Sequence, residues 1–222
     1  MFPVHLGRVT KILCLGAHAD DIEIGCGGTL LAILAQQPAI EVTWVVLSAA
    51  GPRRKEAQAG AAAFLGGAAR SVVVRRFRDT FFPYIGGRIK EFFAELAGRV
   101  SPDIVFTHRR DDLHQDHRLT AELTWNTFRD HTIFEYEVPK YDGDLGQPSL
   151  FVPLDAATAQ RKIELLLAAY PTQRARPWFR AETFGSLLRL RGLECNSPSG
   201  LAEAFYVRKL TLSGSYQSGF PA

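Results

Sequence analysis

Residues 11–36 read KILCLGAHADDIEIGCGGTLLAILAQ, which is an apolar run, a polar loop and a second apolar pattern in direct succession. Residues 11–16 have the pattern of a buried strand, because apolar side chains fill most positions. Between residues 27 and 36 the apolar side chains recur at helical spacing, which predicts a helix. A buried strand that leads through a short loop into a helix is typical of an α/β fold.

The same alternation continues along the chain. Apolar runs rich in β-branched residues predict further strands at residues 41–48, 71–77, 103–107 and 132–138. Helices are expected at residues 55–65, 85–100, 117–128, 156–169 and 182–190, before a strand-like run at 204–210. Such alternation implies a mostly parallel sheet with helices on both faces. No break in composition marks a second domain, so we predict one α/β domain over residues 1–222 with a C-terminal extension.

The composition excludes several classes of function. With 222 residues, 46% hydrophobic and 22% charged, the chain is an ordinary globular protein with one core. The net charge is +3 and the basic residues are scattered, so we expect no nucleic-acid-binding face. We predict no membrane span and no signal peptide, because no apolar stretch is long enough. Three cysteines without a metal-type pairing indicate reduced thiols, and therefore a cytoplasmic protein.

A polar loop follows the first predicted strand. His18 and Asp21 are separated by two residues, so a tight turn can direct both side chains to one point. Imidazole and carboxylate are good zinc ligands, and a catalytic zinc takes about three ligands from the protein. Asp20 is then left beside the metal to act as a base. Two other interpretations stay open: the aspartates can cap the following helix, and the glycines of residues 25–28 suggest dinucleotide binding, although GCGG departs from G-x-G-x-x-G.

A second polar cluster, HRRDDLHQDHRLT at residues 108–120, follows the fourth predicted strand and holds half of the six histidines. His114 and His117 lie three positions apart and can face the same side of a helical turn. Asp116 lies between them and can orient one imidazole, as carboxylates beside metal ligands commonly do. His108 is expected to be a neighbour of the ligands or a loop residue, and not a ligand. The alternative is a solvated loop whose aspartates cap a helix.

The order of the strands would bring these two clusters together. In the common doubly wound order 3-2-1-4-5 the first and fourth strands are neighbours, and ligands bind in the crevice at their carboxyl ends. With this order the two clusters meet, although about ninety residues separate them in the sequence. The sequence therefore predicts a metal site at the carboxyl edge of the sheet.

The two motifs resemble those of the PIG-L (LmbE-like) family of zinc-dependent N-deacetylases. Members carry a Pro-His-Pro-Asp-Asp-Glu-type motif after the first strand of a Rossmann-like domain, and a later His-x-Asp-His motif. Here these read AHADDI at residues 17–22 and HQDH at residues 114–117. Alanines replace both prolines, and Ile22 replaces the glutamate, whose role the nearby Glu23 can take in part. None of these changes removes a ligand.

The resemblance implies a Rossmann-like fold, one zinc ion per chain and hydrolysis of an N-acyl group, above all acetyl. Iron(II) or another divalent metal would suit the same ligands. Carried over position by position, the resemblance assigns zinc to His18, Asp21 and His117, the general base to Asp20, and the acid or oxyanion stabiliser to His114, oriented by Asp116.

The implied substrate is a small acylated amino sugar or its conjugate. Arg53 and Arg54 follow the second predicted strand, and each can bind a substrate hydroxyl or phosphate or simply be solvated. The family-like segment TWNTFRDH adds Arg129 and His131 as candidate contacts. The alternatives are a metal-dependent hydratase of an unsaturated oxo-dicarboxylic acid and a non-catalytic Rossmann-type binding module. A homo-oligomer is compatible with an α/β enzyme of this size, but the sequence shows no interface.

Overall fold

The computed structural model describes residues 9–68 and 70–211 and confirms the α/β prediction. Within these residues the strands form one sheet in the order β3-β2-β1-β4-β5-β7-β6. The first five strands pair in parallel, so their order 3-2-1-4-5 is as predicted, whereas β7 runs antiparallel to both β5 and β6. The strands are β1 (Lys11–Gly16), β2 (Glu41–Val46), β3 (Arg70–Val74), β4 (Ile104–His108), β5 (Thr132–Tyr136), β6 (Leu150–Pro153) and β7 (Ala202–Tyr206).

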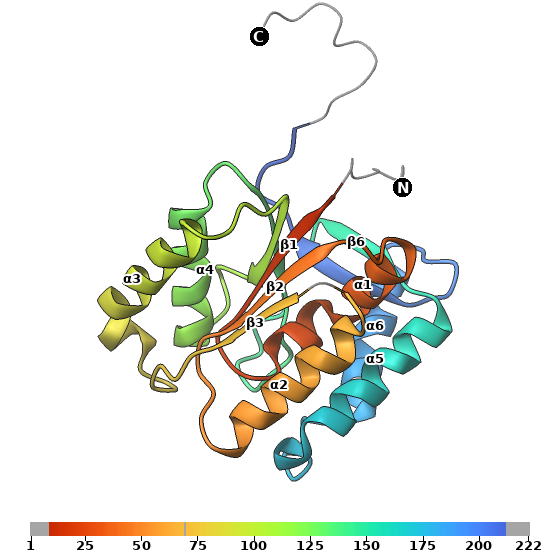
Figure 1. Ribbon diagram of the computed structural model, residues 1–222. Coiled ribbons are helices and arrows are strands. Elements are labelled where there is room, and N and C mark those ends of the chain that lie inside the picture. The colour runs from red at the N-terminus through yellow and green to blue at the C-terminus, as the bar shows by residue number, and fades with distance from the viewer. Residues whose placement is uncertain (1–8, 69, 212–222) are drawn as a thin grey trace, which may run out of the picture.

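Helices cover both faces of this sheet (Figure 1). One face carries α3 and α4, and the other carries α1, α2, α5 and α6. Two short 3₁₀ helices, η1 (Phe82–Ile85) and η2 (Pro171–Gln173), lie in the loops. The α-helices are α1 (Asp21–Gln36), α2 (Pro52–Leu65), α3 (Gly86–Ala97), α4 (Gln115–Thr127), α5 (Ala156–Ala169) and α6 (Ala181–Glu194).

Strand β1 is buried on both faces because its side chains alternate between two hydrophobic clusters. Ile12 and Cys14 pack into the cluster beneath α1, α2 and α5, whereas Leu13 and Leu15 pack into the cluster beneath α3. Full burial of an Ile or Leu side chain contributes about 1.5–3 kcal/mol relative to exposure. The carboxyl end of β1 is therefore a fixed platform for the loop that follows it.

Helix α1 begins at Asp21 and not at residue 27, so the GCGG run lies inside the helix. A Cβ atom on Gly25 would overlap the ring of Tyr136, and one on Gly28 would lie 2.5 Å from Cδ1 of Leu154. The predicted start at residue 27 is wrong: it left Gly25 outside the helix, whereas Gly25 and Gly28 both lie inside it. Their physical role is close packing, because only a residue without a side chain lets α1 approach the sheet this closely.

The C-terminal third completes the sheet. Glu203 on β7 accepts hydrogen bonds from the backbone N–H groups of Gly28 (2.8 Å) and Thr29 (2.7 Å) in α1. Its carboxylate also pairs with Nζ of Lys162 on α5 at 2.5 Å. The predicted C-terminal extension is thus part of the same folded layer, and β6, which has only four residues, is an element that the sequence pattern did not predict.

The structure bears on three further expectations. Cys14, Cys26 and Cys195 are free and buried. In the described ranges no helix has the length and apolarity needed to cross a membrane. Residues 1–8, on which the expectation of no signal peptide depends, lie outside the described residues, as do both ends of the predicted domain.

Candidate metal centre and active site

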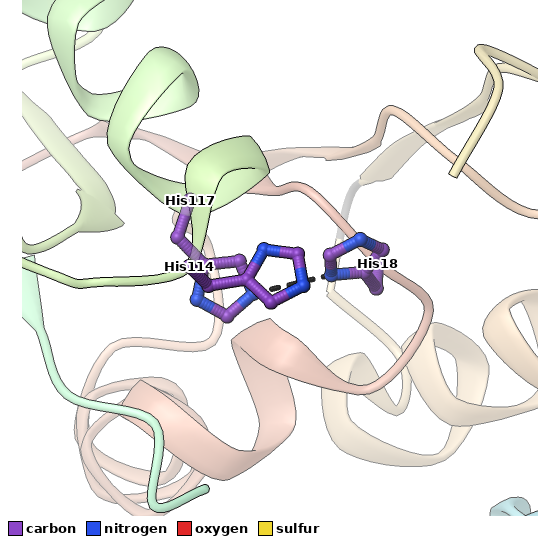
Figure 2. A group of neighbouring side chains, drawn as sticks. All are labelled: His18, His114 and His117. Atoms are coloured by element: carbon purple, nitrogen blue, oxygen red, sulfur yellow. Dashed lines mark hydrogen bonds between the residues drawn. The ribbon is translucent and has the colours of Figure 1, made fainter. Parts of the chain in front are cut away.

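The two polar clusters meet at the carboxyl ends of β1 and β4, which are neighbours in the sheet. His18 lies in the turn after β1, and Asp21 begins α1. His108 ends β4, and His117 lies in the first turn of α4. Figure 2 shows the imidazoles of His18, His114 and His117 gathered in one group, with His18 directed toward His117. The predicted meeting of the two clusters is confirmed.

Three candidate ligands converge within this group. Nδ1 of His18 is 3.1 Å from Nε2 of His117. The carboxylate of Asp21 is 3.4 Å from Nδ1 of His18 through Oδ2, and 3.5 Å from Nε2 of His117 through Oδ1. Tetrahedral zinc with bonds of about 2.0–2.1 Å separates its ligand atoms by about 3.3 Å. The donor chemistry of these residues fits a zinc ion, and each pair of them brings ligand atoms close to this spacing, with a different oxygen of Asp21 in each of its two contacts.

The pKa shifts of His18, Asp21 and His117 favour one positive charge among these three side chains. Burial and the neighbouring His108 lower the pKa of His117 to about 4, so its imidazole is neutral near pH 7 and presents a lone pair. Burial alone would raise the pKa of Asp21, but the surrounding imidazoles, first that of His117, hold this pKa well below its usual range. Burial also opposes a charge on His18, yet the carboxylates of Asp21 and Asp116 raise its pKa. A proton on His18 supplies the charge, and a metal ion would replace it.

Carboxylates contact the outer nitrogens of both imidazoles. Oδ2 of Asp112 is 3.0 Å from Nδ1 of His117. Nε2 of His18 is 3.0 Å from Oδ1 of Asp79 and 3.3 Å from Oδ2 of Asp116. Such contacts fix the tautomer and the ring orientation of metal-binding histidines. Both inner nitrogens are thereby directed at the shared centre.

His114 is held differently from the prediction. The carboxylate of Asp116 does not orient it; its oxygens accept the backbone N–H groups of Thr80 (2.7 Å) and Phe82 (3.1 Å). This contact helps to hold Thr80 at a φ of 62°, which is strained for a β-branched residue. His114 caps α4, and its Nδ1 accepts the backbone N–H of Asp116 at 3.2 Å. Burial and the charge of His18 lower the pKa of His114, so the neutral ring carries its proton on Nε2.

Asp20 is buried beside the ligands and pairs with an arginine. Nη2 of Arg53 donates to Oδ1 of Asp20 at 2.8 Å, and Nη1 of Arg53 donates to Glu56 at 3.0 Å. Burial raises the pKa of Asp20, and the positive charge of Arg53 opposes that shift only in part. Arg54 points elsewhere, because its Nη1 donates to the carbonyl oxygen of Val74 at 2.7 Å. Of the two predicted arginines, the structure brings only Arg53 to the centre.

Arg129 and His131 are not part of the site. Both directly precede β5, and the register pairs Thr132 with Ile104 at the start of β4, so they lie at the amino edge of the sheet. Arg129 donates to a carbonyl oxygen of its own helix terminus, that of Asn126, at 3.2 Å. Their assignment as substrate contacts is wrong, because the resemblance of a segment does not specify which edge of the sheet it occupies.

Three residues near the centre were missed or left undecided. His108 is fully buried, accepts the backbone N–H of Ala17 at 3.0 Å and lies 3.1 Å from Oδ2 of Asp21. Asp112 lies in the second motif, and its position two residues before His114 could have identified it as a residue of the site. Asp79 comes from the loop after β3, and no motif in the sequence marks it.

A family model described as PIG-L, GlcNAc-PI de-N-acetylase, matches residues 13–128, which is just over half of the chain and includes both motifs. The chain belongs to the PIG-L family. The matched range ends at Phe128, directly after α4, so it contains all three candidate ligands and Asp20. The remainder of this PIG-L protein supplies β5, β6, β7, α5 and α6.

Three solved structures share the PIG-L fold. The conserved protein TT1542 from Thermus thermophilus has a TM-score of 0.73 at 20% identity, over 94% of this chain and 99% of that chain. N,N'-diacetylchitobiose deacetylase from Pyrococcus horikoshii has a TM-score of 0.67 at 19% identity, over 90% of this chain and 84% of that chain. The 4-carboxy-2-hydroxymuconate hydratase GalB from Pseudomonas putida has a TM-score of 0.64 at 17% identity, over 93% of this chain and 99% of that chain. Proteins with this fold thus include a deacetylase and a hydratase.

Proposed function

We propose that this PIG-L protein is a zinc-dependent hydrolase that removes an acyl group, above all acetyl, from the nitrogen of an amino sugar or its conjugate. The observation that carries the proposal is the convergence of His18, Asp21 and His117, with ligand atoms 3.1–3.5 Å apart, beside the buried Asp20. A zinc ion held by these atoms would supply Lewis acidity, which polarises an amide carbonyl and makes water more acidic.

Asp20 takes the role of general base. Its buried carboxylate is more basic than that of an exposed aspartate, so it accepts a proton from the attacking water more readily. Arg53 fixes the orientation of this carboxylate through the contact of 2.8 Å. As the water oxygen bonds to the carbonyl carbon, Asp20 takes its proton, which is then available to the leaving nitrogen.

His114 takes the role of hydrogen-bond donor to the carbonyl oxygen. Its Nδ1 is occupied by a backbone N–H, so the Nε2–H is the group left to face a substrate. A donor that is already oriented stabilises the negative charge of the tetrahedral intermediate without reorganisation. When the C–N bond breaks, the products are a carboxylate and a free amine, and acetate is the carboxylate from an N-acetyl group.

The choice of substrate class depends on the relatives and on the arginines. The family description names a GlcNAc-PI de-N-acetylase, and the Pyrococcus horikoshii relative is a diacetylchitobiose deacetylase. The hydratase alternative requires cations that hold two carboxylates. Of the predicted substrate contacts only Arg53 reaches the centre, and it is already paired with Asp20 and Glu56. This pairing favours a hydroxyl-bearing sugar over a dicarboxylic acid.

The test combines metal analysis with acetate release. The purified protein should hold about one zinc per chain, as a catalytic site of three protein ligands does. It should release acetate from N-acetylglucosamine or N,N'-diacetylchitobiose, lose that activity on chelation and regain it when zinc is resupplied. Zinc binding without release from any N-acetyl sugar would favour the hydratase. A protein that binds no zinc after resupply would refute the metal centre and leave the binding module.

We further infer that the substrate is a small molecule and that the protein is cytoplasmic. The free thiols of Cys14, Cys26 and Cys195 suit a reducing compartment. A fractionation experiment that finds the native protein outside the cytoplasm would contradict this inference.

A further inference from the structure

Lys140 lies in the segment between β5 and β6 and is held by two carboxylates. Its Nζ is 3.0 Å from Oδ2 of Asp112 and 2.6 Å from Oδ2 of Asp144. The exposed fractions of these side chains are 12% for Lys140, 3% for Asp112 and 7% for Asp144. Charges that are this well shielded from water interact more strongly than surface ions. One lysine therefore supplies the counter-charge for two buried carboxylates.

Asp112 connects this lysine to the proposed metal centre. The Oδ2 atom that contacts Lys140 is also 3.0 Å from Nδ1 of His117. The other oxygen of Asp112 accepts the backbone N–H of His114 at 2.8 Å. An acceptor at Nδ1 of His117 keeps the ring proton there and leaves the lone pair on Nε2, the nitrogen that faces His18. Lys140 and His117 thus share one carboxylate oxygen.

The backbone around Lys140 has other anchors. Nη1 of Arg109 donates to the backbone carbonyl oxygen of Asp144 at 2.8 Å. On the side of α6, Nη2 of Arg191 donates to the carbonyl oxygen of Gly146 at 3.1 Å. Because these contacts do not involve the lysine, removal of its ammonium group should leave the path of the segment in place.

We propose that Lys140 is a positioning residue of the metal centre: through Asp112 it fixes the imidazole of His117 with Nε2 toward the ion. The inference rests on the metal centre of the proposed function, and Lys140 itself touches neither ion nor substrate. A role confined to folding would lower the melting temperature and leave the zinc affinity of the folded protein unchanged. The proposed role lowers the zinc affinity itself.

The test is a zinc dissociation constant, measured on the full-length protein by competition with a chromophoric chelator. Loss of a group that orients a metal ligand typically weakens metal binding by about 10–100-fold, and we expect Lys140→Met to fall in this range. Asp112→Asn should weaken binding at least as much. Because Lys140 acts through Asp112, the double variant should bind zinc no more weakly than Asp112→Asn alone. Lys11→Met is the matched control, since Lys11 is half exposed and its ion pair with Glu41, the one that it makes within residues 9–68 and 70–211, is at 4.0 Å.

The outcomes separate the inference from the proposed function. A zinc dissociation constant of Lys140→Met within about twofold of that of the unaltered protein would overturn the inference. It would also be overturned if the double variant weakened zinc binding by the product of the two single effects, because the two residues would then act independently. If Lys140→Met does not fold, Lys140→Gln, which keeps an N–H donor without the charge, decides the same question. If the unaltered protein binds no zinc at all, the proposed function fails first, and the inference fails with it.

Discussion

Asp20→Asn should separate the chemistry from the binding of the metal. Asparagine keeps the size of the side chain and an oxygen that can still accept from Nη2 of Arg53, but it cannot take up a proton near neutral pH. Asp20 is not among the three candidate ligands, so the variant should keep its zinc. Its acetate release should fall severely.

The size of the effect follows from the role of the residue. A general base typically contributes about 10²–10⁴-fold to the rate, which corresponds to about 2.7–5.4 kcal/mol in the barrier at 1.36 kcal/mol per tenfold. The stability should change much less, because two effects oppose each other: the attraction to Arg53 is lost, but a buried charge is removed. Arg53 also keeps its pairing with Glu56 at 3.0 Å. Removal of one partner from a fully buried ion pair typically costs about 3–5 kcal/mol, and we expect a smaller loss of unfolding free energy here because the side chain of Arg53 is 25% exposed and keeps its second carboxylate.

The assay measures kcat and KM for acetate release at saturating zinc, the zinc content, and the melting temperature. Because a general base acts only as the carboxylate, the activity of the unaltered protein should decline when the solution is acidified enough to protonate Asp20. Asp20→Asn should lose this acidic decline together with most of kcat. A fall in kcat of less than about tenfold, or a loss of zinc in proportion to the loss of activity, would refute the assignment of the base.

Three more variants test other parts of the structure. His117→Ala should weaken zinc binding by more than the roughly 10–100-fold expected for an outer contact, and an unchanged affinity in chelator competition would exclude it as a ligand. Burial raises the pKa of Glu23 well above its usual value, so its contribution to stability is full below an unfolded pKa of about 4.3 and is lost as the pH rises. Glu23→Gln should therefore gain stability over the unaltered metal-free protein between pH 5 and pH 8 in urea unfolding; an equal difference at both pH values would contradict this. Gly25→Ala places a Cβ atom inside the van der Waals radius of the Tyr136 ring and should cost about 1–3 kcal/mol in the same assay, whereas Gly87→Ala, with no atom within 4 Å, should cost nothing.

The inner strands β1, β2 and β4 were predictable because they are buried on both faces of the sheet. Each of them reads as a largely continuous apolar run, whereas the apolar side chains of the helices between them recur at helical spacing. The start of α1 was not predictable in this way, since glycine counts against a helix in every local measure. The close packing against Tyr136 and Leu154 requires glycine at residues 25 and 28 of this helix, and these partners are more than a hundred residues away in the sequence.

The candidate site was predictable as far as its residues lie in compact motifs. His18 and Asp21 follow one strand and His117 follows another, and the strand order brings these two strand ends together. Asp79 contacts His18, and Lys140 contacts Asp112, from loops whose paths depend on the finished fold. Nothing in their local sequence distinguishes them from solvated surface charges, which are the commoner case.

The carboxylate of Glu203 makes the first 128 residues dependent on the last third of the chain. Its two hydrogen bonds reach the backbone of α1 at Gly28 and Thr29, in the helix that begins at Asp21. A fragment cut at the end of the matched family range would keep every proposed ligand and lose β7 and α5, which pack against that helix. The two motifs therefore depend on the C-terminal third of the chain for their arrangement. An engineer who grafts the two motifs onto another scaffold must also transplant the C-terminal strand that contains neither of them.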